Sequence, residues 1–414
     1  MNYLLNQLNI NLDAPSAWGI YFQDSATPLL TYHLFYMLDG FIGNYYLHII
    51  IVVIVLSCYL LSLLHSKDIS LQKSASIGVR PALINSVGVR RMLDSSSSRG
   101  FSTKTLVNTL TNNHIDPWFI TGFTDAEASF MVIMRKKTKG YVVGWNVELV
   151  FQIKLHRKDQ NLVEAIRDYF GVGRIERKGP DACAIIISSL SEITLKVLPH
   201  FDNYPLKTQK LADYLLWKQV ALIMKRGEHL TEAGLQSIVN LRSSINWGLT
   251  EVLISEFPNT TPVIRPKVVD LPLSILSASD CEWVAGFTSG EGCFKLGIKA
   301  SPRSKVGFQT YLAFYISQHS RDDQLMGSLV NFFGCGYYKS RGEKLNSGDY
   351  YCTSFTDIEG KIIPFFHKHL VRGVKFLDFQ AWCRVAEMMQ KGDHKIPEGL
   401  EIIRQIKSGM NRGR

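Results

Sequence analysis

One stretch decides the fold: Trp118-Phe-Ile-Thr-Gly-Phe-Thr-Asp-Ala-Glu-Ala-Ser-Phe130 recurs once, as Glu282-Trp-Val-Ala-Gly-Phe-Thr-Ser-Gly-Glu-Gly-Cys-Phe294. Within the two copies Gly122 aligns with Gly286 and Glu127 aligns with Glu291, so the glycine and the acid keep the same spacing in both. A recurrence of this length indicates an internal duplication of the chain.

The likeness continues to the end of both copies. Gly171-x-Gly173 matches Gly334-x-Gly336, and Asn246-x-Gly248 matches Asn411-x-Gly413. From position 199 onward the offset between matched positions is constant. Two full-length copies in nearly constant register predict two similar domains rather than a solenoid.

Each copy alternates helical and strand-like patterns. After the leading apolar helix, the alternation over residues 141–155 predicts a strand, and the pattern over residues 160–170 predicts a helix. A Gly-x-Gly turn then opens a hairpin through residues 185–187, and helical patterns at 207–224 and 231–245 close the copy. We therefore predict an α+β fold with one antiparallel sheet in each repeat.

The leading helices each contain a glycine, Gly122 or Gly286, although glycine inside a helix costs roughly 1 kcal/mol relative to alanine. This cost is explained if the two helices pack backbone to backbone. Glu127 and Glu291 follow near the helix C-termini, where the macrodipole disfavours negative charge. One such Glu is ordinarily a solvated surface residue. Two at matched positions, related by a pseudo-two-fold axis, predict a shared site for an oxygen-preferring divalent metal.

The motif segments resemble those of a known family, the LAGLIDADG homing endonucleases of the single-chain, two-repeat, intron-encoded mitochondrial type. The resemblance is carried by Ile120–Ala128, Val284–Gly292, Pro199–Leu206, Glu228–Glu232 and Ile406–Gly413 and extends over most of the C-terminal three quarters of the chain. It implies two αββαββα domains in a monomeric nuclease unit. It also implies double-stranded DNA lying along the sheets and double-strand cleavage that leaves staggered ends.

The resemblance further implies a divalent metal, Mg²⁺, at the acid pair. Glu127 and Glu291 are the implied catalytic residues and metal ligands, assisted by the backbone carbonyls of Ala126 and Gly290. A metal ion so held lowers the pKa of an attacking water and offsets charge on the phosphate.

Three positions depart from the family pattern. Ala128 replaces the usual glycine after the first acid, and Tyr315 stands where the first copy has Gln152, a position that helps order active-site solvent. Ser354 occupies the place where the family pattern suggests an active-site lysine. None of these changes removes a metal-binding acid, so binding should survive even if turnover falls. Gln152, Tyr315 and Ser354 are assigned to the periphery of the site.

Basic residues cluster where the strands and their loops are expected. Strand alternation would turn one sheet face toward the major groove, with loop Lys and Arg side chains on phosphates. Any one of them could be an ordinary solvated side chain, but matched sets in both copies favour DNA contact. The predicted DNA-binding residues are Arg135, Lys136, Lys137, Lys139, Arg174, Arg177, Lys178, Lys295, Lys299, Arg303, Lys305, Lys339, Arg341 and Lys344.

The positive charge of the chain is unevenly distributed. Residues 1–100 hold 6 of the 46 Lys and Arg and 5 of the 36 Asp and Glu, so almost all of the net charge of +10 lies in residues 101–414. A basic part beside a nearly neutral one favours a polyanionic partner. The seven cysteines form no C-x-x-C pair, so neither a zinc site nor a redox motif is indicated.

Residues 45–64 read YYLHIIIVVIVLSCYLLSLL, without an acidic, Lys or Arg side chain. A helix of this length crosses a hydrocarbon core of ~30 Å. The alternative, a buried core helix, is disfavoured because residues 1–110 contain no other strong periodic element. Residues 1–44 contain no Lys or Arg, whereas basic residues follow from Lys67 onward, which places the C-terminal body on the inner side of the membrane.

The N-terminal segment Asp13–Pro28, DAPSAWGIYFQDSATP, resembles the start of mitochondrially encoded cytochrome c oxidase subunit 2. The C-x-x-x-C copper-binding signature of that subunit is absent. The resemblance therefore implies an intron reading frame fused in phase to an upstream exon. It also implies a mitochondrial product whose C-terminal body faces the matrix, with the N-terminal segment in the inner membrane unless it is cleaved.

The predicted domain organisation follows from these features. Residues 1–65 form the oxidase-like N-terminus, and the polar, serine-rich stretch 66–114 forms a flexible linker in which a protease could free the C-terminal body. Residues 115–262 form the first repeat domain, 263–279 an inter-domain linker, and 280–414 the second repeat domain.

Three functions compete. The intact acid pair favours a site-specific DNA endonuclease that serves intron homing. The departures at Ala128, Tyr315 and Ser354 are compatible with the alternative, an RNA maturase that binds its own group I intron and promotes splicing with little or no nuclease activity. The third, a respiratory membrane subunit, is opposed by the missing copper signature.

Overall fold

The computed structural model describes residues 115–137, 143–269, 272–342 and 344–411, which belong to one compact unit. The predicted membrane helix at residues 45–64, the oxidase-like N-terminus and the linker at 66–114 lie outside the described residues. Among the helices of the described part, none combines the length and apolar character needed to cross a membrane.

The first repeat begins with α6 and ends with α12. Its elements are α6 (Pro117–Glu127), β1 (Ala128–Lys136), β2 (Trp145–His156), η1 (Arg157–Asp159), α7 (Gln160–Phe170), β3 (Arg174–Arg177), β4 (Ala182–Ile187), α8 (Leu190–Glu192), η2 (Ile193–Val197), α9 (Leu198–Asn203), α10 (Lys210–Lys225), η3 (Glu228–Leu230), α11 (Glu232–Arg242) and α12 (Glu251–Glu256). The predicted helix at 160–170 is confirmed as α7. It buries Leu162, Val163, Ile166 and Phe170 at helical spacing and ends at Gly171, whose φ of 66° suits glycine.

The second repeat follows the same order. Its elements are α13 (Ala278–Glu291), β5 (Gly292–Ala300), β6 (Phe308–His319), η4 (Ser320–Asp322), α14 (Asp323–Phe333), β7 (Tyr337–Ser340), β8 (Ser347–Cys352), α15 (Phe355–Asp357), η5 (Ile358–Ile362), α16 (Ile363–Lys368), α17 (Val374–Lys391), η6 (Asp393–Lys395) and α18 (Pro397–Ser408). The matching sequence therefore folds into matching elements.

Each repeat builds one four-stranded antiparallel sheet, with strand order β1-β2-β4-β3 in the first and β5-β6-β8-β7 in the second. The strands alternate as expected: Phe130 and Val132 on β1 are buried, whereas Ser129 and Arg135 are exposed. The predicted α+β fold with one sheet per repeat is confirmed.

One face of each sheet is covered by a long helix. α10 packs on β1 and α17 packs on β5. The two contacts are built alike, because Trp217 Nε1 donates to the carbonyl of Met131 and Trp382 Nε1 donates to the carbonyl of Lys295, both at 3.0 Å. The opposite face of each sheet, called the outer face below, is left free of these helices.

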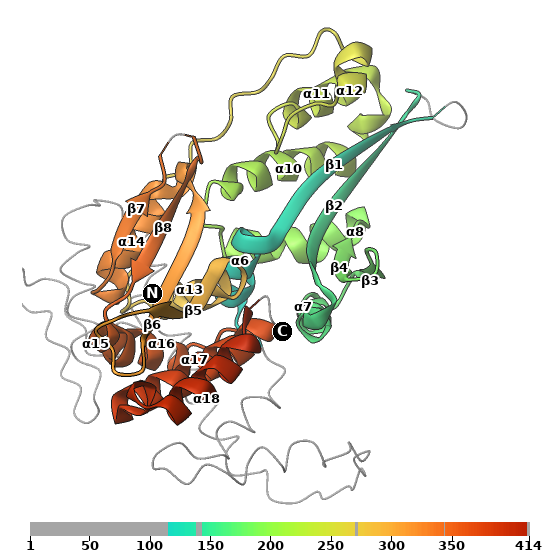
Figure 1. Cartoon of the computed structure of the whole chain (residues 1–414). Coiled ribbons are helices and arrows are strands. Elements are labelled where there is room, and N and C mark those ends of the chain that lie inside the picture. Colours follow the sequence, from blue (N-terminus) through green and yellow to red (C-terminus); the bar gives the residue numbers. More distant parts are fainter. Residues whose placement is uncertain (1–114, 138–142, 270–271, 343, 412–414) are drawn as a thin grey trace, which may run out of the picture. The chain divides into compact units, whose positions relative to one another are not determined.

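The two leading helices form the centre of the described unit. In Figure 1, α6 and α13 lie between the sheet of the first repeat and that of the second, and they contact each other along their lengths. A Cβ atom on Gly122 would lie 2.0 Å from the carbonyl oxygen of Trp283, and one on Gly286 would lie 2.1 Å from that of Phe119. The helices therefore approach backbone to backbone where only glycine fits.

Candidate active site

The two acids stand at the ends of the central helices. Glu127 is the last residue of α6 and Glu291 is the last residue of α13, and the next residue of each chain segment is extended and begins a strand. A Cβ atom on Gly290 would lie 2.4 Å from the Cβ of Ala126 and 3.2 Å from Glu127 Oε1. The helix ends are thus in contact, and Glu127 lies beside the backbone of the other repeat.

This contact explains a difference between the repeats. At the residue before the acid, the first repeat has Ala126 and the second has Gly290. Because a methyl group on Gly290 would collide with that of Ala126, only one of the two positions can carry a side chain. Ala128, which follows the first acid and begins β1, has a buried side chain at 4% exposure.

Burial disfavours the charged form of both acids. Desolvation raises the pKa of Glu127, and it raises the pKa of Glu291 to about 7, with the negative charge of Glu127 as the second cause. Two partly desolvated carboxylates that repel each other are stabilised by a cation placed between them.

Two lysines converge on the same helix ends. Lys210 Nζ donates to the carbonyl of Thr124 at 2.8 Å, and Lys375 Nζ donates to the carbonyl of Gly290 at 2.7 Å and also to that of Gly292. Their positive charges lower the pKa of both acids, and burial lowers the pKa of each lysine. The acid pair is therefore flanked by one lysine from each repeat.

Neither lysine was among the residues predicted from the sequence. A signal was present, because Lys210-x-x-Asp213 recurs as Lys375-x-x-Asp378 at the offset that all matched positions share in this part of the repeats. Both lysines lie in the first turn of a helix, α10 or α17, far downstream of the acid of their own repeat.

Ser354, which the sequence assigned to the periphery of the site, has a structural role in the fold. Ser354 is the N-cap of α15, and its Oγ accepts a hydrogen bond from Asp357 N. Ser189 caps α8 of the first repeat in the same way, so serine at this position serves helix capping in both copies. The lysines near the acids come from α10 and α17 instead.

Gln152 and Tyr315 occupy equivalent places on the sheets. Gln152 on β2 is paired with Ser129, and Tyr315 on β6 is paired with Cys293, so each lies opposite the residue two positions after an acid. The Tyr315 ring packs against that of Tyr351, with centroids 5.7 Å apart, and desolvation raises the pKa of its hydroxyl. Tyr315 thus brings an aromatic ring where the first repeat has an amide.

The donors at this site suit a magnesium-like ion. Among the described residues, no group of three or more His, Cys, Asp and Glu side chains could hold a metal. Mg²⁺, however, is commonly bound through one or two carboxylates, with water and phosphate oxygens completing its shell. Glu127 and Glu291 supply two carboxylates, and the carbonyl of Gly290 can accept a second partner besides Lys375.

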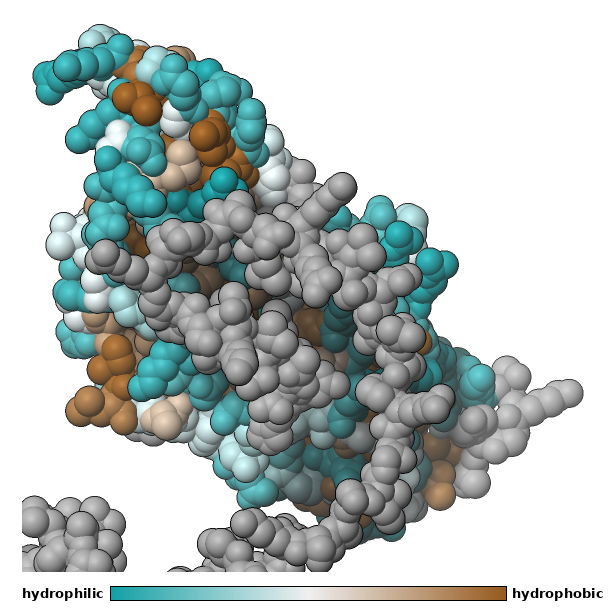
Figure 2. Space-filling view, turned by 90° about the horizontal axis from the view of Figure 1, so that it is seen from below, coloured by the Kyte–Doolittle hydropathy of each residue, from teal (hydrophilic) through white to brown (hydrophobic). Residues whose placement is uncertain are grey.

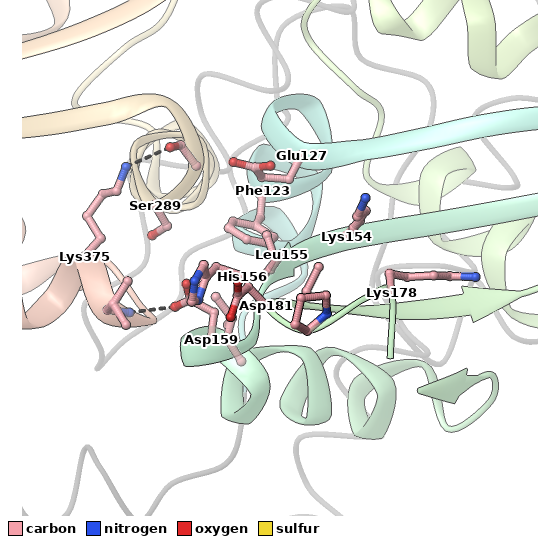
Figure 3. A pocket seen from close by; sticks show the side chains of 15 residues that line it. Phe123, Glu127, Lys154, Leu155, His156, Asp159, Lys178, Asp181, Ser289 and Lys375 are labelled. Atoms are coloured by element: carbon pink, nitrogen blue, oxygen red, sulfur yellow. Dashed lines mark hydrogen bonds between the residues drawn. The ribbon is translucent and has the colours of Figure 1, made fainter. Parts of the chain in front are cut away.

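A cleft of about 640 Å³ opens beside Glu127. Figure 3 shows Glu127 above Phe123, with Lys375 on one side and Lys154 and Lys178 on the other. His156 and Asp159 also line it. A cleft with several cationic side chains next to an acid pair fits a phosphodiester backbone.

The outer sheet faces hold only part of the predicted basic set. Arg135, Lys295, Lys299 and Lys339 alternate onto the outer faces. Arg174 and Arg341 are also there, each paired with an acid of its own sheet. Lys137, Arg303, Lys305 and Lys344 are exposed next to strand ends.

Two of the predicted contacts lie on the sheet face opposite the outer face. Lys136 falls on the same side of β1 as Val132 and its Nζ binds Glu256 of α12 at 2.6 Å, while Arg177 is paired with the buried Cys183. Lys178 follows β3, binds Glu176 and lines the cleft. Lys139 lies outside the described residues.

The two outer faces differ in chemistry. The first carries a cluster of five apolar side chains, here called the apolar patch: Met131, Ile133, Val150, Ala184 and Ile186. The second carries tyrosines with lysines around them: Tyr311, Tyr315, Tyr337 and Tyr351. The coloured surface seen in Figure 2 is mostly hydrophilic, and its hydrophobic residues gather in a few small patches.

Comparison with known sequences places these features in context. A family model described as LAGLIDADG endonuclease matches residues 120–221 and 284–386, which include both acids and both lysines. The "Probable intron-encoded endonuclease 2" of Neurospora crassa is 36% identical over 306 residues, 72% of this chain and 65% of the relative. The chain therefore spans just under two thirds of that protein's length.

Solved structures extend the likeness. The I-SmaMI LAGLIDADG homing endonuclease bound to cleaved DNA is 44% identical, with a TM-score of 0.69 over 73% of this chain and 98% of that one. The same protein has been solved on its uncleaved DNA target in the presence of calcium ions. In addition, 28 residues of the chain, 7% of it, are 71% identical to cytochrome c oxidase subunit 2 of Podospora anserina, 11% of that protein.

Proposed function

Because the chain belongs to the LAGLIDADG homing endonuclease family, we propose that it is a site-specific DNA endonuclease that makes a Mg²⁺-dependent double-strand break during intron homing. The observation that carries the proposal is the contact between the helix ends of α6 and α13 that carry the two acids, flanked by Lys210 and Lys375. Each repeat contributes one acid and one lysine, as cutting two strands requires.

The residues of the site divide the chemical work. Glu127 and Glu291 would hold the metal with the carbonyls of Ala126 and Gly290, and the bound ion would activate water and offset charge on the phosphate. Lys210 and Lys375 place partly buried ammonium groups beside the acids. There they stabilise negative charge that develops on the phosphate oxygens, because a preorganised cation acts strongly where water is excluded.

The DNA target would lie across both outer sheet faces. Two different sheets in one chain read two different half-sites, so a monomer suffices for an asymmetric target. Lys295, Lys299 and Lys339 reach toward the duplex from the second sheet and Arg135 from the first, while Lys154 and Lys178 line the cleft at the phosphate backbone.

We place the protein in mitochondria, with its nuclease part on the matrix side. Support comes from the intron-encoded relatives and from the short likeness to cytochrome c oxidase subunit 2. A fusion to an upstream exon and an N-terminal membrane helix at residues 45–64 remain parts of this proposal.

The proposal is tested with purified full-length chain and DNA spanning the exon junction without the intron. Cleavage of both strands in Mg²⁺ but not in Ca²⁺ is expected. Glu127→Gln and Glu291→Gln should abolish cutting while DNA affinity in Ca²⁺ stays within about twofold of the parent, because each change removes one charge and keeps the shape.

An RNA maturase is the second candidate, and Tyr315 in place of a glutamine is the observation in its favour. If the chain binds the junction DNA tightly and cuts neither strand in Mg²⁺, the nuclease proposal fails. Stimulated splicing of the intron RNA by the same preparation would then support the maturase.

A further inference from the structure

Two aspartates connect the repeats by equivalent hydrogen bonds. Asp159 Oδ1, in the first repeat, accepts from Val374 N at 2.7 Å, and Asp322 Oδ1, in the second, accepts from Gln209 N at 2.7 Å. Each aspartate ends a short turn, η1 or η4, that follows the second strand of its sheet. The pair is therefore reciprocal, and each bond leaves its own repeat.

Both bonds reach the residue immediately before a site lysine. Val374 precedes Lys375 and Gln209 precedes Lys210. Figure 3 shows the first case, with Asp159 bonded to the start of α17 and Lys375 bonded above it to the end of α13. The N-terminal turn that carries each lysine is thus held by a carboxylate from the opposite repeat.

The aspartate has no competing side-chain cap at the start of α17, whereas at the start of α10 Thr208 Oγ1 also accepts from Lys210 N, at 3.2 Å. Gln209 is the N-cap of α10 and Gly373 is the N-cap of α17, and neither provides a side-chain hydrogen bond to its helix. A Cβ atom on Gly373 would lie 2.3 Å from Asp159 Oδ1, so glycine leaves room for the incoming carboxylate. A charged acceptor at a helix N-terminus satisfies a free N–H and interacts favourably with the helix dipole.

The two turns have the same internal construction. His156 Nδ1 accepts from Lys158 N, and His319 Nδ1 accepts from Arg321 N, both at 3.1 Å. The pattern is therefore His-x-x-Asp in both repeats. The histidine side chain stabilises the turn, and the aspartate side chain binds the opposite repeat. Its duplication argues against a chance contact.

We propose that Asp159 and Asp322 are positioning residues, each holding the lysine of the opposite repeat over the acid pair. The proposal rests on the nuclease function described above. A lysine side chain is long and flexible, so a fixed Nζ requires a fixed helix start. Cutting by one half of the site then depends on a residue of the other half.

The first test measures the lysines themselves, without DNA. The full-length chain is labelled briefly with acetic anhydride, and the modification of Lys210 and Lys375 is compared by mass spectrometry. Asp159→Ala should raise the labelling of Lys375 at least about fivefold and leave that of Lys210 unchanged. Asp322→Ala should raise the labelling of Lys210 and leave that of Lys375 unchanged. Asp159→Asn, which keeps an oxygen acceptor, should preserve protection, and Asp168→Ala, at an exposed position of α7, is the control.

The second test measures nicking of each strand by the same variants in Mg²⁺. Asp159→Ala should slow the same strand as Lys375→Ala, about tenfold or more in kcat with little change in KM. The double variant should be no slower than Lys375→Ala alone. Asp322→Ala should likewise slow the same strand as Lys210→Ala, and the double variant should be no slower than Lys210→Ala alone.

Opposite outcomes overturn the inference. An aspartate variant that raises the labelling of both lysines equally would show a merely structural role. So would a variant that raises the labelling of the lysine in its own repeat. Additive effects of Asp159→Ala and Lys375→Ala on one strand would do the same. If the parent cuts no DNA, the nuclease proposal fails, and the labelling result still decides whether the aspartates position the lysines.

Discussion

The backbone of Trp283 fills the space beside Gly122, since a Cβ atom on Gly122 would lie only 2.0 Å from the Trp283 carbonyl oxygen. The same relationship holds between Gly286 and Phe119, at 2.1 Å. Because the obstacle is backbone on a buried helix, it cannot rotate away as a side chain would.

Gly122→Ala and Gly286→Ala are therefore expected to force the central helices apart. We expect a loss of at least about 3 kcal/mol in the free energy of unfolding, measured by urea denaturation. Gly327→Ala is the matched control, because Gly327 also lies in a helix, α14, and a Cβ atom there meets nothing within 4 Å. It should be neutral or stabilise by up to about 1 kcal/mol. Equal effects of the three changes would contradict the close helix contact.

The raised pKa of Glu291 predicts a pH-dependent effect of Glu291→Gln. Desolvation raises the folded pKa from 4.5 to about 7, so the acid destabilises the metal-free fold as pH rises between these values, and fully above them. Relative to the parent, Glu291→Gln should be more stable at pH 8 than at pH 4.5 by about 1–3 kcal/mol. Thermal unfolding with a chelator measures this difference.

A divalent ion should reduce the difference in stability between Glu291→Gln and the parent at pH 8, because it stabilises the parent and not the variant. A stability difference that does not change with pH would contradict the desolvated environment of Glu291.

Lys210→Ala and Lys375→Ala should slow cleavage far more than they weaken binding. Each lysine lies against the helix end that carries an acid, so its loss removes positive charge where the phosphate reacts. We expect single-turnover cleavage about 100-fold slower and DNA affinity in Ca²⁺ within about threefold of the parent. Lys407→Ala, on α18, is the control. Loss of DNA binding in parallel with cleavage would place the lysines in general phosphate contact instead.

The apolar patch of the first sheet predicts a preference for thymine. Its side chains offer apolar contact to the C5-methyl group, which is the feature that distinguishes thymine from uracil in the major groove. Replacing dT by dU in the half-site under the first repeat should weaken binding about 2- to 4-fold for each contacted methyl.

The same replacement under the second repeat should have a smaller effect, because that outer face is built from tyrosines and lysines. Ile133→Thr should reduce the sensitivity of the first half-site. Equal sensitivity of the two half-sites to this replacement, measured by competition binding in Ca²⁺, would contradict thymine contact by the apolar patch.

The central part of the site was predictable because it depends on a local pattern that occurs twice. A glycine five residues before an acid places both on one helix, and the duplication supplies the second helix. The lysines were missed because tertiary packing brings Lys210 and Lys375 to helix ends that lie far earlier in the chain. Their spacing repeats, but spacing alone does not say that they meet the acids.

The division of the predicted basic residues between the two sheet faces has a geometric cause. Arg135 and Lys136 are neighbours on β1, so strand alternation sends them to opposite faces, and a cluster in the sequence cannot become a cluster on one face. The capping role of Ser354 was not predictable for a different reason, since a serine that caps a helix has no distinctive pattern until the helix start is known.

The most direct test is the position of a metal ion in crystals of the full-length chain with its DNA target and Mn²⁺. Anomalous scattering should place Mn²⁺ between the carboxylates of Glu127 and Glu291, in contact with a phosphate oxygen of the DNA. A metal bound elsewhere, with both carboxylates contacting only Lys210 and Lys375, would contradict the central claim that the paired acids hold metal against the DNA backbone.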